Sequence, residues 1–142
     1  MIILDTNVLS ALMRSQPDVS VVEWLDELPP VSIWITSITV LEVRTGLEFL
    51  VASRRRKRIE LAFGQLLRED LDGRVLSFDI AAAEIAGTLV ARQKQAGKSM
   101  EIRDAQIAGI TLARKATLAT GNTRHFKDIG IKLIDPWNRT AS

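Results

Sequence analysis

Residues 1–10, MIILDTNVLS, place an aspartate directly after a short apolar run. Residues 2–4 have the composition of a buried strand, and apolar residues then recur at the spacing of a helix. A strand that passes at once into a helix begins an α/β pattern. Asn7 is expected to cap this helix, while Asp5, at the end of the strand, is either a capping residue or part of a site.

The alternation of strands and helices continues to the end of the chain. Strands are predicted around residues 31–36 and at RVLSF (74–78), ATLAT (116–120) and IKLID (131–135). Two helices are expected in each of the first three connections and a helical start in the last. This order predicts the α/β class, with a mostly parallel sheet of four or five strands covered by helices on both faces. The length of 142 residues is that of one domain, 1–142.

Several residues of the predicted helices have structural interpretations. Trp24, Phe49 and Phe63 lie at core spacing and are expected to pack in the interior. Asp79 stands where an N-cap belongs, after the strand RVLSF. RRRKR (54–58) leads into a helix, and such a charge run is either a solvent-exposed face or a track for nucleic-acid phosphates.

The composition narrows the chemistry that the chain can perform. With 19 basic and 17 acidic residues the net charge is +2, which is compatible with a phosphate-rich partner but does not identify one. The chain has no cysteine, no tyrosine and one histidine, so disulfide scaffolds, thiolate metal sites and a two-histidine acid/base pair are excluded. No segment has the pattern of an export signal or a membrane span, and the cytoplasm is expected. Any catalysis therefore rests on carboxylates, hydroxyls or lysines.

Acidic and amide side chains follow the predicted strands at positions that share one edge of the sheet. They are Asp5 after the first strand, Glu42 early in the helix after the second, Asp104 early in the helix before the fourth, and Asn122 after the fourth. In parallel α/β sheets ligands bind at the carboxyl ends of the strands. Crowded carboxylates repel one another, and a divalent cation removes that conflict. Oxygen ligands favour Mg²⁺ or Mn²⁺, ions that support phosphoryl or phosphodiester chemistry.

Motifs along the chain resemble one protein family. The segments are MIILDTNVLSALMR (1–14), SITVLEVRTGLE (37–48), IRDAQIAGI (102–110), ATGNTRHF (119–126) and LIDPW (133–137). They are similar, in the same order, to segments of the PIN-domain ribonucleases, specifically the VapC and FitB-like toxins of bacterial toxin-antitoxin pairs. The resemblance implies a single PIN domain with an α/β/α sandwich and Mg²⁺- or Mn²⁺-dependent cleavage of RNA. It also implies a homodimer, inhibition by a small VapB-like antitoxin, and a higher assembly with operator DNA bound through that antitoxin.

The resemblance assigns roles residue by residue. Asp5, Glu42 and Asp104 match the acidic positions of the family and would bind the metal directly or through water. Thr6 matches a hydroxyl that orients these groups. Asn122 matches a fourth position that many relatives fill with aspartate, so one negative charge fewer is present and a single well-held ion is expected. The implied reaction is attack of metal-activated water on structured RNA such as tRNA, which leaves 5′-phosphate and 3′-hydroxyl ends.

The same residues also have structural alternatives. Thr39-x-x-Glu42 has the spacing of a capping box. Asp104 suits the first turn of any helix, where a negative charge favours the helix dipole. Asn122 suits a turn. Taken one at a time, none of these residues distinguishes a site from a structural role; their convergence and their order in the family pattern favour the site.

Other positions depart from the family pattern or lie beside it. Arg103 and Gly121 are not the commonest residues next to two of the motifs, and they suggest no mechanism. Asn7 either caps the first helix or supports Asp5. His125 is a lone histidine after a turn and is expected to be a surface or partner contact, not a ligand.

Three other functions compete with a nuclease toxin. A degenerate PIN domain that binds RNA or a partner without cutting is left open by Asn122, although three carboxylates argue against it. A haloacid-dehalogenase-like phosphatase needs a second acid two positions after the first, where Asn7 stands. A receiver-like signalling domain needs adjacent acids near the end of the first strand and a lysine after a late strand, and the sequence has neither.

Overall fold

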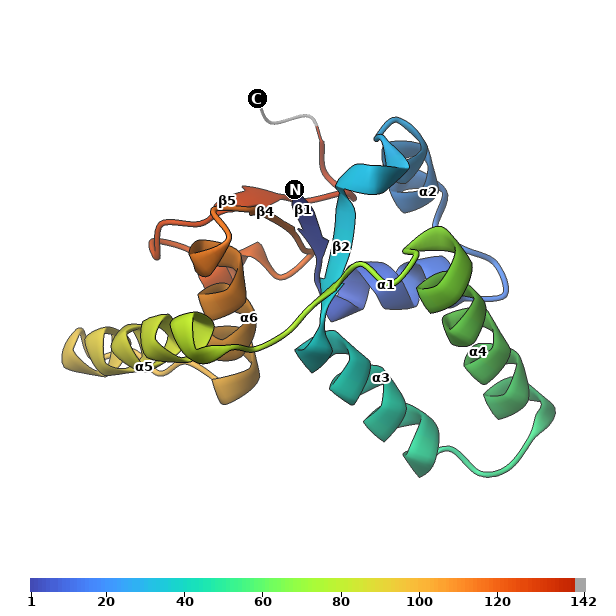
Figure 1. Cartoon of the computed structure of the whole chain (residues 1–142), viewed down its shortest axis with the longest axis horizontal. Helices are drawn as coiled ribbons and strands as arrows, with labels where there is room; N and C mark the ends of the chain where they lie inside the picture. The colour runs from blue at the N-terminus through green and yellow to red at the C-terminus, as the bar shows by residue number, and fades with distance from the viewer. Residues whose placement is uncertain (140–142) are drawn as a thin grey trace.

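Strand β1 (Ile2–Leu4) forms the centre of the sheet in the computed structural model, which describes residues 1–139 (Figure 1). Within these residues five strands pair in the order β3-β2-β1-β4-β5, and every pair is parallel. The register places Ile2 opposite Ile33 of β2 and Leu4 opposite Ala119 of β4. The α/β class and the parallel sheet expected from the sequence are confirmed.

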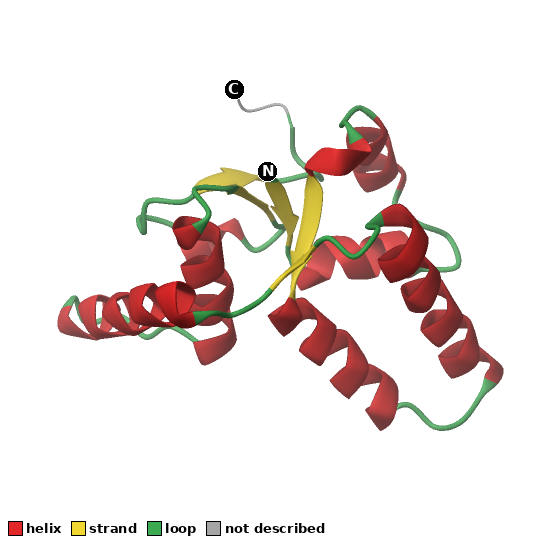
Figure 2. Cartoon of the chain, in the orientation of Figure 1, coloured by secondary structure: helices red, strands yellow, loops and turns green. Residues whose placement is uncertain are grey.

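The elements follow the predicted order along the chain, and Figure 2 distinguishes the helices from the strands. The other strands are β2 (Ile33–Thr36), β3 (Val75–Leu76), β4 (Thr117–Ala119) and β5 (Lys132–Ile134). The helices are α1 (Thr6–Met13), α2 (Val19–Asp26), α3 (Ser37–Phe49), α4 (Arg54–Gln65), α5 (Ile80–Gln95) and α6 (Ile102–Ala113). Short helical turns occupy Pro30–Ser32, Leu66–Asp70 and Thr123–Phe126.

Helices cover both faces of the sheet, which gives a three-layer α/β/α arrangement. Helices α5 and α6 lie on one side of the strands, and α1 to α4 lie on the other (Figure 1). Each side has its own apolar core, one including Leu9, Val21 and Phe63 and the other including Ile107 and Phe126. The strands are rich in isoleucine, leucine and valine because both faces of the sheet are buried. These layers leave the carboxyl ends of β1 and β4 as the edge where helix starts and loops meet.

Most of the helices have a polar N-cap residue. The N-cap side chain accepts a hydrogen bond from a first-turn backbone N–H at Asp5, Asp18, Thr36, Ser53 and Asp79. The predicted cap at Asp79 is confirmed. The expectation that Asn7 caps α1 is wrong, because the helix begins at Thr6 and Asp5 is the cap. Asn7 supports Asp5, which was the alternative interpretation.

Three local expectations need correction. Trp24 and Phe63 are buried as predicted, but Phe49 is 86% exposed, because it is the last residue of α3 and that end reaches away from the strands (Figure 1). The basic run RRRKR lies inside α4, after the cap at Ser53, and does not precede the helix. The second strand begins at Ile33 because the preceding residues form a 3₁₀ turn.

Helices α5 and α6 approach each other closely at Gly109. A Cβ atom at this position would collide with the backbone carbonyl oxygen of Ala82 and would lie 3.1 Å from the Cβ of Ala86. Glycine at this position therefore allows the two helix backbones to pack together. Asp104 lies on the same helix, so the contact also fixes the position of a candidate site residue.

The longest helix, α5, has 16 residues, and no helix within residues 1–139 is long and apolar enough to cross a membrane. Over the same residues every buried side-chain nitrogen or oxygen has a hydrogen-bond partner.

Candidate active site

All the predicted site residues line one cavity at the carboxyl ends of β1 and β4, called the acidic cavity below. It has a volume of about 300 Å³ and includes Asp5, Thr6, Glu42, Asp104 and Asn122 in its lining. These side chains come from the end of β1, from α1, α3 and α6, and from the loop after β4. The convergence expected from the strand order is therefore present.

Asp5 is buried, with 6% of its surface exposed, and its carboxylate is held by three donors. The backbone N–H of Thr6 donates to Oδ1 at 2.8 Å, and the Thr120 hydroxyl and the Asn7 amide donate to Oδ2 at 2.7 and 3.2 Å. Asp5 is thus the cap of α1 and also a fixed carboxylate facing the cavity. The capping interpretation is confirmed, and the role of Asp5 in a site stays a prediction.

Thr120 joins the two central strands at the site, and sequence reasoning missed it. This residue follows β4 and is fully buried. Its hydroxyl donates to Asp5 and accepts hydrogen bonds from the Asn7 amide at 3.2 Å and from the backbone N–H of Asn122 at 2.9 Å. The signal in the sequence was a hydroxyl residue at the end of a predicted strand, on the same edge as Asp5.

Glu42 is held by α1 and by α6. Its Oε1 accepts a hydrogen bond from the Thr6 hydroxyl at 2.9 Å, and its Oε2 lies 3.2 Å from Nη1 of Arg103. The Thr39 hydroxyl lies 3.0 Å from that of Thr6. The capping-box interpretation of Thr39 and Glu42 is wrong, because α3 is capped by Thr36, one turn earlier.

Asp104 contacts His125, which was expected to lie at the surface or in a partner contact. The Nδ1 atom of His125 is 3.1 Å from Oδ2 of Asp104, and His125 lines the same cavity. Burial raises the pKa of the Asp104 carboxyl above its usual value; the nearby His125 opposes the shift, and the negative charges of Asp5 and Glu101 add to it. The histidine is half-exposed, with 51% of its side chain accessible, so the surface part of the expectation is correct.

Asn122 and its neighbour Gly121 fix the loop after β4 against α1. The Gly121 N–H donates to the Asn7 side-chain oxygen at 3.0 Å, and the Asn122 N–H donates to Thr120. Asn122 is exposed and lines the cavity. Its amide oxygen is a neutral ligand beside the carboxylates of the cavity, Asp5, Glu42, Glu101 and Asp104.

The donor set fits a hard divalent cation with few protein ligands. Within residues 1–139 no three His, Cys, Asp or Glu side chains are grouped closely enough to hold an ion together. Asp5, however, is close enough to Asp104 for its negative charge to raise the pKa of the Asp104 carboxyl. A cation bound between the two carboxylates would relieve this repulsion. Mg²⁺ is commonly held by one or two carboxylates and keeps several waters. The residues present therefore fit a pair of carboxylate ligands, with Glu42 occupied by Thr6 and Arg103.

The raised pKa of Asp104 predicts the effect of Asp104→Asn on stability. In EDTA at pH 7 to 8, the variant should melt at a higher temperature than the wild type, because the amide mimics the neutral carboxyl that burial favours. In the wild type the neutral carboxyl is stabilising below the pKa of the unfolded chain, near 3.9, and this stability is lost as pH rises through the higher folded pKa. The two melting temperatures should therefore converge towards pH 4 in circular dichroism melts. A variant that is less stable than the wild type at pH 8 would contradict the assignment.

Comparison with known proteins identifies the family of this chain. The family model of the PIN domain matches residues 2–132. VapC ribonuclease Y4jK of Sinorhizobium fredii is 36% identical over 137 residues, 96% of this chain and 98% of the relative. Toxin FitB of Neisseria gonorrhoeae is 33% identical over 138 residues, 97% and 99% of the two chains. The solved structure of FitAB bound to a DNA fragment superposes with a TM-score of 0.88 at 33% identity and covers 97% of this chain and 96% of that chain. The resemblance noted in the motifs is confirmed, and the chain belongs to the PIN domain family.

Proposed function

We propose that this chain, as a single PIN domain over residues 1–142, is a metal-dependent endoribonuclease toxin. The observation that carries the proposal is the single cavity in which Asp5, Glu42 and Asp104 converge with Asn122. The names of the relatives support it, since one is a VapC ribonuclease and another is the toxin FitB. The motifs that resemble the family contain each of these residues.

Asp5 and Asp104 would hold the cation directly, and Glu42, whose two oxygens are engaged by Thr6 and Arg103, would act through water. When bound, Mg²⁺ or Mn²⁺ lowers the pKa of water and neutralises charge on a phosphodiester. The protein's own part is orientation, because Thr120 and Asn7 fix the Asp5 carboxylate and Thr6 fixes Glu42. Such fixed groups need little rearrangement when charge develops on the phosphate.

His125 and Asn122 complete the lining around the carboxylates. His125 contacts Asp104 and so sets the position of that carboxylate. Asn122 supplies a neutral oxygen, so the cavity carries less negative charge than an aspartate at this position would give, which favours one ion over two.

The substrate and partners are proposed by resemblance to the family. The substrate is a structured RNA such as tRNA, and the products carry 5′-phosphate and 3′-hydroxyl ends. The toxin acts in the cytoplasm as a homodimer and is inhibited by a VapB-like antitoxin. FitAB has been solved bound to a DNA fragment, which supports a higher assembly that reaches operator DNA through the antitoxin.

The test is cleavage of total bacterial RNA by the purified chain after removal of any antitoxin. With Mg²⁺ or Mn²⁺ we expect discrete cuts with 5′-phosphate ends, and no cuts in EDTA. As a readout independent of activity, saturating Mn²⁺ should raise the melting temperature of the wild type, since a ligand at 100 times its Kd contributes about 2.7 kcal/mol. The same addition should have little effect on Asp104→Asn.

Two results would contradict the proposal. RNA cleavage that persists in EDTA would exclude the metal. A folded protein that binds Mn²⁺ but cuts no RNA would favour the alternative, a degenerate PIN domain that binds without catalysis.

A further inference from the structure

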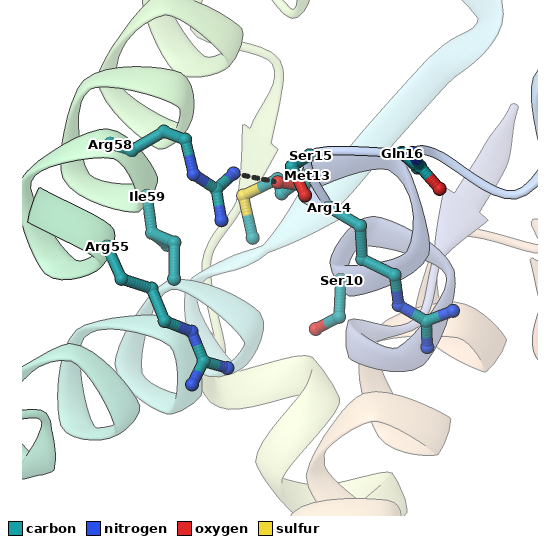
Figure 3. A pocket seen from close by; sticks show the side chains of 8 residues that line it. All are labelled: Ser10, Met13, Arg14, Ser15, Gln16, Arg55, Arg58 and Ile59. Atoms are coloured by element: carbon teal, nitrogen blue, oxygen red, sulfur yellow. Dashed lines mark hydrogen bonds between the residues drawn. The ribbon is translucent and has the colours of Figure 1, made fainter.

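A second cavity, the arginine cavity, lies between the end of α1 and helix α4. It has a volume of about 560 Å³, and Arg14, Arg55 and Arg58 are among its eight lining residues (Figure 3). The others are serine, methionine, glutamine and isoleucine side chains, and none is acidic. Three positive charges therefore face one hollow with no negative charge in its wall.

These arginines have no ion-pair partner within residues 1–139. The only hydrogen bond that their guanidinium groups make there is a long one, 3.4 Å from Nη1 of Arg58 to the backbone oxygen of Met13. Arg56 differs, although it lies in the same basic run, because it is paired with Glu60 at 2.8 Å and with Glu48 at 3.2 Å. In the run RRRKR, Arg56 therefore has a structural role, whereas Arg55 and Arg58 are free to bind an anion.

The arginine cavity is next to the acidic cavity. Ser10 lines both of them, and in the view of Figure 3 it lies between the guanidinium groups of Arg14 and Arg55. Helix α1 links the two, since Asp5 is its N-cap and Arg14 its C-cap. At a rise of about 1.5 Å per residue, the backbone of α1 advances roughly 13 Å along the helix axis from Asp5 to Arg14. A stacked strand rises about 3.4 Å per nucleotide, so this distance is about four nucleotides.

We infer that Arg14, Arg55 and Arg58 hold backbone phosphates of the RNA substrate, about four nucleotides from the bond that is cut. The inference rests on the proposed nuclease function, because the acidic cavity defines where the cut bond lies. Guanidinium groups suit this task, since their planar donors bind phosphate oxygens in pairs. Arg55 and Arg58 are one helical turn apart and so present their donors on the same side of α4.

An extended polyanion fits these observations better than an acidic protein segment. Ser10 lines both cavities, so a strand bound at the arginines lies beside the cavity that holds the carboxylates. A strand of RNA offers an anion at every residue and needs no apolar surface. The lining includes only Met13 and Ile59 as large apolar side chains, which gives a protein helix little to bury.

The experiment compares two double variants of α4 with the same change in charge. Arg55→Gln/Arg58→Gln removes two cavity arginines, while Arg54→Gln/Lys57→Gln removes two exposed cations of the same helix that do not line the cavity. Binding of a fluorescein-labelled, 20-nucleotide, mixed-sequence RNA is measured by anisotropy in EDTA at several salt concentrations. Melting temperatures confirm that each full-length variant is folded.

The cavity variant should lose about 10-fold in affinity, and its salt slope should fall by about 1.4, since each phosphate contact to a single strand contributes about 0.7. The control should change affinity less than about 3-fold, because exposed charges that make no phosphate contact act only at long range and are screened by salt. Arg14→Gln, from a different helix, should reduce affinity further when added to the cavity variant. Equal losses in the two double variants would overturn the inference, because overall charge would then account for the binding.

Poly-L-glutamate and a cleavage assay complete the experiment. If the two double variants differ in their affinity for poly-L-glutamate but not in their affinity for RNA, the cavity binds an acidic protein segment and the inference is overturned.

Cleavage of total RNA with Mn²⁺ is assayed on the same proteins. If the wild-type protein cuts no RNA and the cavity variant loses RNA binding, the proposed nuclease function is refuted and the arginine site is still supported. Cleavage and binding that are both unchanged in the cavity variant would refute the site alone.

Discussion

We expect the Asp5→Asn protein to fold normally and to cut RNA at least about 10³-fold more slowly than the wild type. The amide cannot supply the negative charge that a cation needs, and the ion's contribution to catalysis is worth several kcal/mol, at 1.36 kcal/mol for each factor of ten. The fold survives because asparagine is also a favourable cap and can still accept from the Thr6 N–H. Cleavage rates and circular dichroism melts of the purified variant measure the two effects.

Asp79→Asn is the matched control for this change. Asp79 caps α5 by accepting from the Ala82 N–H at 3.0 Å, as Asp5 caps α1, but it does not line the acidic cavity. Since asparagine is an equally good cap, the control should keep its cleavage rate within about twofold of the wild type. If both variants lost activity together, capping and helix stability would account for the loss, and Asp5 would not be a catalytic residue.

The second large effect is on stability, at the contact between α5 and α6. Gly109→Ala should destabilise the protein by about 2 kcal/mol, because the new methyl group would collide with the carbonyl of Ala82 and the helices must separate. For a chain of this size that corresponds to a fall in melting temperature of roughly 4 to 10 °C. Cleavage should fall as well, since a shift of α6 displaces Asp104. Urea and thermal unfolding measure the change.

Gly87→Ala makes the same substitution where the space is open. Gly87 lies in α5, and a Cβ atom there has no neighbour within 4 Å. Alanine should stabilise the protein by up to about 1 kcal/mol through its higher helix propensity. The two substitutions should therefore have opposite signs. A Gly109→Ala protein as stable as Gly87→Ala would show that the helices can move apart at no cost.

The sequence was sufficient to predict the convergence of the acidic residues, because parallel strands bring their carboxyl ends to one edge. Asp5 was placed by that rule, and Glu42 and Asp104 were placed because the helix after the second strand and the helix before the fourth both begin at that edge. Thr120 could not be assigned in the same way, since its contact with Asp5 depends on β4 pairing directly with β1. Which strands are neighbours in the sheet cannot be read directly from the sequence, which only limits the connections that are possible between them.

Local signals failed where two structures compete for the same residues. Thr39 and Glu42 have capping-box spacing, but β2 continues to Thr36 and the helix begins one turn earlier than that pattern requires. Phe49 follows the helical period of α3, yet the period does not tell where the helix passes the edge of the sheet. His125 lies in a short 3₁₀ turn, whose position against Asp104 depends on the path of the whole loop.

The hydrogen bond from Thr120 to Asp5 joins residues 115 positions apart, and this separation sets the order of events during protein synthesis. A ribosome adds roughly 5 to 20 residues per second, so Thr120 is made on the order of 10 s after Asp5. Until then β1 lacks its neighbour β4, and the nascent chain has the first carboxylate without the hydroxyl that orients it. A chain whose translation stops early therefore yields no assembled site, and activity begins only after nearly all of the protein has been made.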